Sequence, residues 1–213
     1  MQFKVAGLYA ITPDLEDTAR LCQMVEASIL GGASVVQYRN KVANEALRFA
    51  QASALLPICR QHQIPFIIND HLDLFLALDA DGLHIGGDDG DISAAKQGIG
   101  KHKILGVSCY TAFSNAEKAE KAGADYVAFG AFFPTTTKQT EYVAEPDLLS
   151  WWQELMEIPC VAIGGITPDN MAAYRAAGAS GFGLGSALYA PGRSAEQVRE
   201  KAKVFVQAWA RPI

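Results

Sequence analysis

Short runs of apolar and β-branched residues alternate with longer amphipathic segments along the whole chain. Eight of these runs predict strands, because each is bounded by glycine, proline or polar residues. They cover residues 5–11, 34–38, 66–68, 82–85, 104–108, 126–130, 161–164 and 181–184. Helical periodicity is clearest over residues 15–30, 44–61, 114–122 and 195–208. This alternation is typical of βα units built around a parallel sheet.

Similar glycine-containing phrases precede several of the predicted strands: GGAS, DADG, GADY and AGASG. We interpret each as the same helix-to-strand turn, in which Gly31, Gly123 and Gly178 take the left-handed conformation that ends a helix. Eight repeated units predict a single (β/α)₈ TIM barrel, with a doubly wound open sheet as the alternative. No linker or charge run divides the chain, so we expect one domain over residues 1–213.

Composition narrows the class of protein. The chain has 213 residues, of which 50% are hydrophobic and 19% are charged, and its formal net charge is −5. Such a composition predicts a globular fold, and the acidic balance argues against a nucleic-acid partner, which would need a basic face. No apolar run approaches the roughly 18 residues of a membrane span. We therefore predict a cytoplasmic protein with small-molecule substrates, and leave open whether it forms a homo-oligomer.

Common cofactor and hydrolase motifs are missing from the sequence. It contains no GxxxxGK[ST], HExxH or GxSxG, and the GxG at residues 183–185 lacks the third glycine of a dinucleotide fingerprint. The four cysteines are scattered without a CxxC pair, which predicts reduced, buried thiols. The chemistry must therefore be sought at the carboxyl ends of the strands, where barrel enzymes place their working residues.

The second predicted strand ends in QYRNK. As long as the strand continues, alternation places Gln37, Arg39 and Lys41 on one side, and an amide with two cations suits a polyanion. The alternative is a solvated strand end, where charged residues are common.

The third and fourth strands end near carboxylates, Asp70 in one case and Asp88, Asp89 and Asp91 in the other. Mg²⁺ is usually held by one or two carboxylates, with substrate phosphates and water completing the octahedron, so adjacent strand ends predict a metal site. The alternative is that Asp70 caps the next helix and that the other three lie in a solvated capping loop. We expect His84 to be structural.

The remaining candidates follow strands six, seven and eight. PTTTK at residues 134–138 is either a phosphate-binding turn or a flexible polar loop. GGITP at 164–168 and GLGS at 183–186 carry the glycines that let backbone N–H groups approach an anion, although tight turns also need glycine. Barrels often bind phosphate at their last two loops. The rim thus carries two predicted anion sites, as a transfer between two phosphorylated molecules requires.

Eight segments, in order and spacing, resemble the thiamine-phosphate synthase family over nearly the whole chain. They are LYAITPD, QYRNK, IINDH, GLHIG, ILGVS, GADYVAFG, PTTTK and AIGGIT. The resemblance implies a transferase that joins hydroxymethylpyrimidine diphosphate to a thiazole phosphate, carboxylated or plain, with Mg²⁺. The implied reaction releases pyrophosphate and forms thiamine phosphate. The family's proposed route is dissociative: the diphosphate departs first, and the thiazole nitrogen then attacks the pyrimidine methylene cation.

Roles on the pyrimidine side carry over by motif. The resemblance implies that Gln37, Arg39 and Lys41 hold the pyrimidine diphosphate, and that Asn69 and Ser108 contact the pyrimidine. Arg39, Lys41 and Ser108 thereby become candidate catalytic residues.

Roles in the metal site and the departure of the diphosphate carry over in the same way. Asp70 and Asp89 match the Mg²⁺ ligands. Lys138 matches the lysine that assists the diphosphate as it leaves, and is the fourth candidate catalytic residue.

Roles on the thiazole side fall on the later loops. The resemblance implies that Thr135 and Thr137 contact the thiazole phosphate. It also implies that Gly165, Gly185 and Ser186 bind its phosphate through backbone N–H groups.

Three positions depart from the family pattern. Asn40 stands where Glu is common, but alternation points its side chain away from the site. Gly87 replaces an amide in the fourth-strand loop, and Tyr110 stands where a histidine is frequent. The related thiazole tautomerases depend on a histidine in that region and commonly lack the metal acids, so the balance favours the synthase. A different phosphate-handling barrel isomerase and a silent thiazole-phosphate-binding protein remain as rivals.

Overall fold

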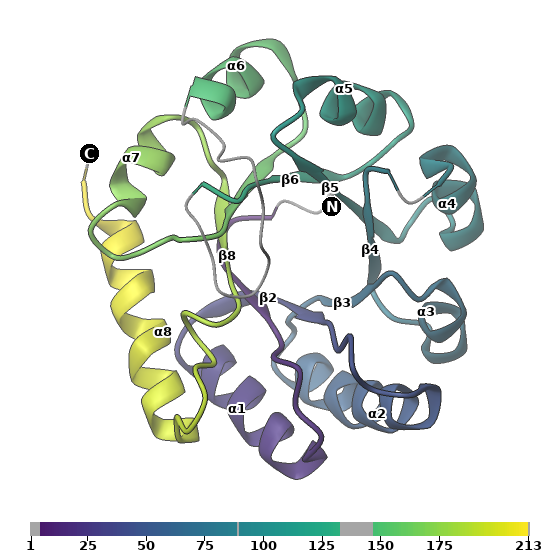
Figure 1. The fold of residues 1–213 in the computed structure, drawn as a ribbon, viewed down its shortest axis with the longest axis vertical. Helices are drawn as coiled ribbons and strands as arrows, with labels where there is room; N and C mark the ends of the chain where they lie inside the picture. The colour runs from purple at the N-terminus through teal and green to yellow at the C-terminus, as the bar shows by residue number, and fades with distance from the viewer. Residues whose placement is uncertain (1–4, 89, 133–146, 213) are drawn as a thin grey trace.

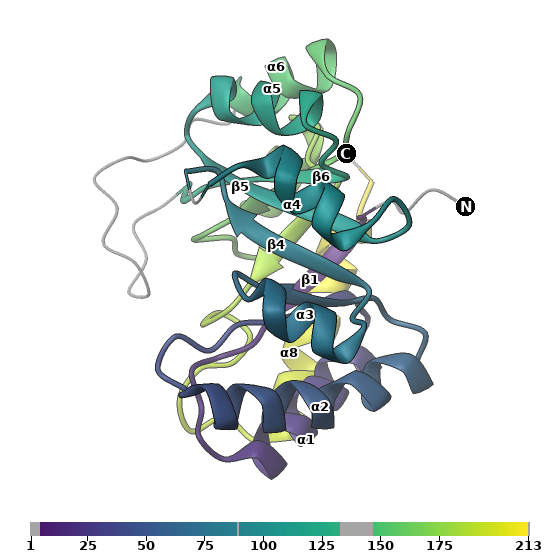
Figure 2. The ribbon, with the colours of Figure 1, turned by 90° about the vertical axis from the view of Figure 1, so that its right-hand side faces the viewer.

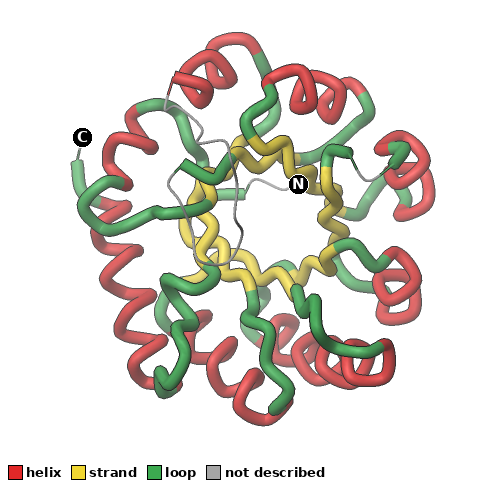
Figure 3. The backbone as a smooth tube through the Cα atoms, in the orientation of Figure 1, coloured by secondary structure: helices red, strands yellow, loops and turns green. Residues whose placement is uncertain are grey.

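The computed structural model describes residues 5–88, 90–132 and 147–212. Within these residues, eight parallel strands close into a barrel in chain order, and eight helices surround it (Figures 1 and 3). The strands are β1 (Gly7–Ile11), β2 (Ala33–Tyr38), β3 (Phe66–Asn69), β4 (Gly82–Gly86), β5 (Ile104–Tyr110), β6 (Tyr126–Phe129), β7 (Cys160–Ile163) and β8 (Gly181–Leu184). The predicted barrel is therefore confirmed, and the open-sheet alternative is wrong.

The helices form the outer ring, and in Figure 2 α3 and α4 cover the strands on one side. They are α1 (Thr18–Leu30), α2 (Glu45–Gln61), α3 (Leu72–Leu78), α4 (Ile92–Ile99), α5 (Phe113–Lys121), α6 (Asp147–Leu155), α7 (Met171–Ala176) and α8 (Ala195–Ala210). The ring closes where α8 packs against α1 and α7 (Figure 1). None of the described helices is long and apolar enough to cross a bilayer.

Local sequence sets the ends of the helices. Asp17 and Asn44 cap α1 and α2 through their side chains, and Ser194 forms a capping box with Gln197 at α8. Gly123 and Gly178 take positive φ after their helices, as predicted, but Gly31 does not. There the left-handed residue is Gly32, at φ 105°, so the turn ends one residue later than expected.

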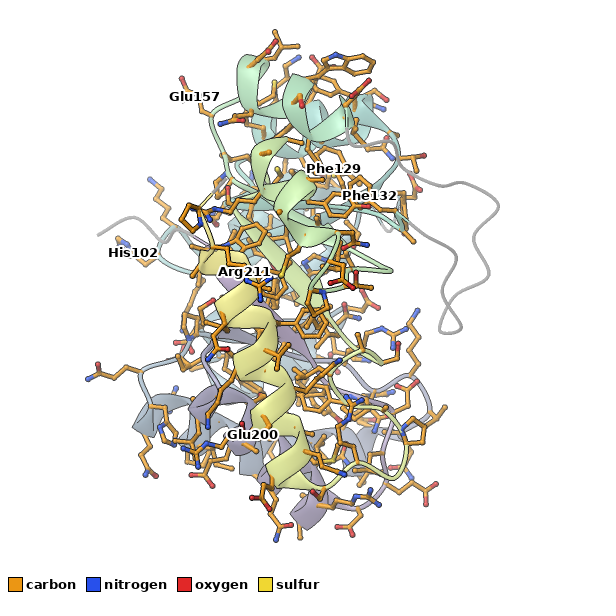
Figure 4. All side chains as sticks on the ribbon, turned by 90° about the vertical axis from the view of Figure 1, so that its left-hand side faces the viewer. His102, Phe129, Phe132, Glu157, Glu200 and Arg211 are labelled. Atoms are coloured by element: carbon orange, nitrogen blue, oxygen red, sulfur yellow. The ribbon has the colours of Figure 1, made fainter. Side chains whose placement is uncertain are left out.

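Strand alternation divides the core into two layers. Outward side chains such as Tyr38, Phe66 and Phe182 pack against the helices. The inward cluster fills the barrel with Val5, Tyr9, Val35, Ile67, Ile104, Tyr126, Ala128 and Val161. Figure 4 shows the contrast between inside and outside: Phe129 and Phe132 lie within the molecule, while Glu157, Glu200 and His102 project from it. A packed interior leaves the carboxyl ends of the strands as the place for a pocket.

All four cysteines are free thiols. Cys59, Cys109 and Cys160 are buried, and Cys22 is half-buried. Burial raises the pKa of each thiol, so none of them is an activated nucleophile.

Candidate active site

A cavity of about 420 Å³ opens at the carboxyl ends of the strands, and residues at the end of every strand line it. This volume suits a small-molecule ligand. The described candidates that line it are Gln37, Arg39, Lys41, Asn69, Asp70, Ser108, Gly165, Gly185 and Ser186. The other four, Asp89, Thr135, Thr137 and Lys138, lie outside the described residues. The structure thus brings all nine described residues with a role implied by the resemblance to one pocket, whereas Asp88 and Asp91 do not line it.

The cationic side of the pocket is held in place by residues from the end of β1. The Thr12 hydroxyl donates to the Arg39 carbonyl at 2.9 Å and accepts from the Arg39 N–H at 2.8 Å. The Asp14 carboxylate accepts from the Lys41 N–H at 2.8 Å and lies 3.7 Å from the Arg39 guanidinium. Sequence reasoning missed this clamp, although Thr12 and Asp14 both stand in the LYAITPD segment.

Asn40 points away from the pocket, as alternation predicts. Its side chain is buried, donates to the Gln51 side chain at 3.0 Å and to the Leu15 carbonyl at 3.1 Å, and accepts from the Val42 and Ala43 N–H groups. It therefore pins the loop that follows β2 to α2 and to the loop after β1.

Asp70 lies where β3 turns over the rim. It has a φ of 62°, and its N–H donates to the His84 carbonyl at 2.8 Å. The Asp70 carboxylate is exposed and accepts from the Asn69 amide at 2.7 Å. The capping alternative is wrong for Asp70, because α3 begins at Leu72 and His71 occupies its N-cap position. It is right for Asp91, which caps α4 through its side chain.

A magnesium ion fits one part of this rim. Asp70 supplies a hard carboxylate in the pocket, and no described ion pair uses it. No three His, Cys, Asp or Glu side chains among the described residues could hold a metal by themselves, and the second predicted ligand, Asp89, is not among them. One protein carboxylate with substrate phosphates is an ordinary Mg²⁺ environment.

A second side of the pocket, formed by the loops after β7 and β8, is made of backbone. Gly164 and Gly165 follow β7 with φ of 88° and 73°, a backbone conformation that residues with a side chain rarely adopt. Asn170, another residue missed from sequence, fixes their loop: its amide donates to the Gly165 carbonyl at 3.0 Å and accepts from the Thr167 N–H at 2.8 Å. After β8 the chain turns at Gly185, whose carbonyl accepts from two later N–H groups.

The floor between the two sides is polar and buried. His84 is 3% exposed, and its ring nitrogens lie 2.9 Å from the Tyr126 hydroxyl and 2.8 Å from the Ser108 hydroxyl. Burial lowers its pKa to about 4 and raises the pKa of Tyr9 and Tyr126. The side chain is thus a neutral structural element, in line with the prediction.

Comparisons with known proteins agree with this arrangement. The family model described as thiamine monophosphate synthase matches residues 8–188. A thiamine-phosphate synthase of Nitrosomonas eutropha is 49% identical over 96% of this chain and 94% of its own length. That of Janthinobacterium sp. is 42% identical over 99% and 100%.

A solved structure shows the same fold and a related sequence. The thiamine phosphate pyrophosphorylase of Pyrococcus furiosus superposes with a TM-score of 0.80 over 95% of each chain, at 30% identity. With the family match and the close relatives, this establishes that the chain belongs to the thiamine monophosphate synthase family.

Proposed function

We propose that this chain condenses hydroxymethylpyrimidine diphosphate with a thiazole phosphate, giving thiamine phosphate and pyrophosphate. The observation that carries the proposal is one pocket with two unlike anion-binding sides. Its β2 side offers the cationic side chains of Arg39 and Lys41, and its β7–β8 side offers glycine backbone. Two phosphorylated substrates need both, and the family relatives bear the matching name.

The diphosphate belongs on the β2 side. Arg39 can fork onto phosphate oxygens, while the exposed Lys41 supplies a mobile charge beside it. The Thr12 and Asp14 clamp holds the backbone of both residues before substrate arrives, so little ordering is needed on binding.

Magnesium is proposed as the cofactor, with Asp70 as its ligand in the described chain and Asp89 as the second ligand. When bound, the ion would neutralise charge that develops on the departing diphosphate. Lys138 is proposed to act on the same leaving group. The roles of Asp89 and Lys138 are carried by the resemblance in sequence.

The pyrimidine ring is proposed to lie on the floor between the two sides. Gln37, Asn69 and Ser108 line this region from three different strands. All three carry polar groups that can hydrogen-bond to ring nitrogens or to an amino group. The ring would then project its diphosphate toward Arg39.

The thiazole phosphate belongs on the glycine side. Gly165, Gly185 and Ser186 lie at the loops after β7 and β8, where their backbone can approach the phosphate closely. Thr135 and Thr137 are proposed to contact the same substrate, again from the resemblance. In this placement the pyrimidine methylene carbon and the thiazole nitrogen that attacks it would share one cavity.

Loss of diphosphate before attack needs charge stabilisation more than a general base. Arg39 and Lys41 can stabilise the leaving group, and an enclosed site keeps water from the cation. The pocket fits this demand, because its described histidine, His84, is buried with both ring nitrogens engaged. Tyr110 disfavours the tautomerase alternative, because it stands where that activity depends on a histidine.

A product assay tests the proposal. The purified chain is incubated with both substrates and Mg²⁺, and pyrophosphate and thiamine phosphate are measured. We expect the two products in equal amounts. An isomerised thiazole without pyrophosphate would indicate a tautomerase, and tight thiazole phosphate binding without any product would indicate a silent binding protein.

A further inference from the structure

A chain of five hydrogen-bonded side chains crosses the barrel under the pocket. The Gln37 amide nitrogen donates to the Tyr9 hydroxyl at 2.9 Å, and the two tyrosine hydroxyls, Tyr9 and Tyr126, lie 2.6 Å apart. The Tyr126 hydroxyl lies 2.9 Å from His84 Nδ1, and His84 Nε2 lies 2.8 Å from Ser108 Oγ. Both ends, Gln37 and Ser108, line the pocket.

The links have one direction because the first donor has no choice. An amide N–H₂ can only donate, so the Tyr9 oxygen accepts from Gln37. The single Tyr9 proton is buried and needs an acceptor, and among the described contacts the Tyr126 oxygen at 2.6 Å is the one that can accept it. Tyr126 then donates to His84 Nδ1. A ring nitrogen that accepts carries no proton, so the His84 proton is on Nε2 and is donated to Ser108.

The direction decides what the pocket presents to a ligand. With one amide N–H used below, Gln37 keeps its carbonyl oxygen as an acceptor for a ligand in the cavity that it lines. Ser108 accepts from His84, which leaves its own hydroxyl proton to donate. We propose that Tyr9, Tyr126 and His84 are positioning residues that set Gln37 as the acceptor and Ser108 as the donor for the pyrimidine.

The packing of the barrel holds this chain rigid. Tyr9 and Tyr126 are fully buried, with ring centroids 5.8 Å apart, and the His84 ring stacks on Tyr126 at 5.6 Å. Gly106 pairs in register with Tyr126, and a Cβ there would overlap the Tyr126 ring and hydroxyl. A glycine on β5 therefore makes room for the tyrosine that crosses the barrel.

The chemistry of the ligand follows, and this step rests on the proposed function. A ligand on this floor needs a donor opposite Gln37 and an acceptor opposite Ser108. An aminopyrimidine offers both, an exocyclic amino group and an unprotonated ring nitrogen. An oxopyrimidine offers the reverse, a carbonyl and a ring N–H. The chain of hydrogen bonds would thus select the amino form, because a mismatch leaves buried polar groups unpaired.

The direction can be tested without any activity. Nitrogen-15 NMR of the histidine rings in the substrate-free, full-length protein reports which ring nitrogen carries the proton. A His84→Gln variant identifies the His84 signals among the four histidines. We expect Nε2–H in the wild type. Nδ1–H would overturn the proposed polarity, whatever reaction the protein catalyses.

Selectivity is tested with one broken link and a matched control. Tyr126→Phe removes a buried hydroxyl inside the chain, and Tyr38→Phe removes one on the outer side of the barrel, where it donates to Gln51 at 2.9 Å. Calorimetry then gives the Kd of the aminopyrimidine diphosphate and of its oxo analogue for each protein, with thermal melts as the check on folding. Tyr9→Phe breaks the next link and replaces Tyr126→Phe if that variant does not fold.

We expect the wild type and Tyr38→Phe to prefer the amino form equally. We expect the broken link to reduce that preference at least tenfold. An unchanged preference for the amino form in the folded variants would mean that the hydrogen-bonded side chains are merely structural, and would overturn the proposal. Failure of the wild type to form thiamine phosphate, with Nε2–H present and the amino form preferred, would reject the proposed reaction and leave this inference standing.

Discussion

The two sides of the pocket that we propose as anion sites offer different groups. On the β2 side the working groups are side chains, Arg39 and Lys41, whose backbone is clamped from β1 by Thr12 and Asp14. On the β7–β8 side the working groups are backbone, and Asn170 holds the loop. A diphosphate that must be released suits concentrated, movable charge, whereas a phosphate monoester that only anchors its substrate suits fixed dipoles. The difference matches a donor and an acceptor of one transfer reaction.

Removing the charge on the β2 side should have the largest effect. Arg39→Ala takes away a forked contact to the departing diphosphate, so we expect kcat/KM to fall by about 10²–10³-fold. Arg39→Lys keeps charge without the fork and should recover part of the loss. The control is Arg60→Ala, at the far end of α2, where the side chain donates to the Asp79 carbonyl. Equal kinetics for Arg39→Ala and Arg60→Ala would remove Arg39 from the site.

Protonation of His84, on the floor of the pocket, should lower the stability of the folded protein in acid. The pKa of His84 is about 4 in the folded protein, against an ordinary 6.5, because the ring is buried. The unfolded chain therefore binds more protons between these values, and stability is lost as pH falls from about 6.5 toward 4. The loss attributable to His84 is about 3 kcal/mol.

Denaturant unfolding across this pH range measures that loss. The His84→Gln variant carries the same carboxylates but no imidazole, so the difference between the two proteins isolates His84. Parallel pH profiles for wild type and variant would contradict the buried, neutral histidine.

A pair of glycine substitutions probes the β7–β8 side. A Cβ at Gly185 meets only the Ile11 carbonyl oxygen, at 3.9 Å, so Gly185→Ala should fold normally. It should still raise KM for the thiazole phosphate about tenfold, since one methyl group between backbone and phosphate costs on the order of 1–3 kcal/mol.

Gly165→Ala separates strain from obstruction. Gly165 has a φ of 73°, so alanine there should also lower the free energy of unfolding by about 1–2 kcal/mol. Steady-state kinetics with thermal melts distinguishes the two variants. A normal KM in Gly185→Ala would place the phosphate elsewhere.

The smallest effect is expected at the clamp. Asp14→Ala removes the acceptor for the Lys41 N–H, and the loss of one hydrogen bond predicts a roughly fivefold fall in kcat/KM. Asp14→Asn keeps an oxygen at that place and should restore most of the activity. If the amide variant is as impaired as alanine, the charge of Asp14 matters and the clamp does not.

Strand periodicity predicted the barrel and one side of the site. Alternation predicts one side for Gln37, Arg39 and Lys41, and this pattern is local enough to be read from five consecutive residues. β2 itself ends at Tyr38, so Arg39 and Lys41 reach the same pocket from the loop that follows the strand. The glycines at 164, 165, 183 and 185 can be read from the sequence just as directly, because backbone that approaches a ligand needs glycine.

The supports of the site could not be predicted in the same way. Tyr9 and Tyr126 are 117 residues apart and meet only because the barrel closes. Thr12 lies just beyond the end of β1 and hydrogen-bonds to Arg39, just beyond the end of β2. Asn170 holds a loop whose shape depends on two positive φ angles. Such contacts are set by three-dimensional closure and leave no periodic signal in the sequence.

On the proposed function, each side of the pocket binds its own substrate. Calorimetric titration of the pyrimidine diphosphate with Mg²⁺, and separately of the thiazole phosphate, into Arg39→Ala and Gly185→Ala tests it directly. We predict a crossed pattern: Arg39→Ala weakens the diphosphate and spares the thiazole phosphate, and Gly185→Ala does the reverse. Loss of the same ligand in both variants would show that the two sides do not bind separate substrates.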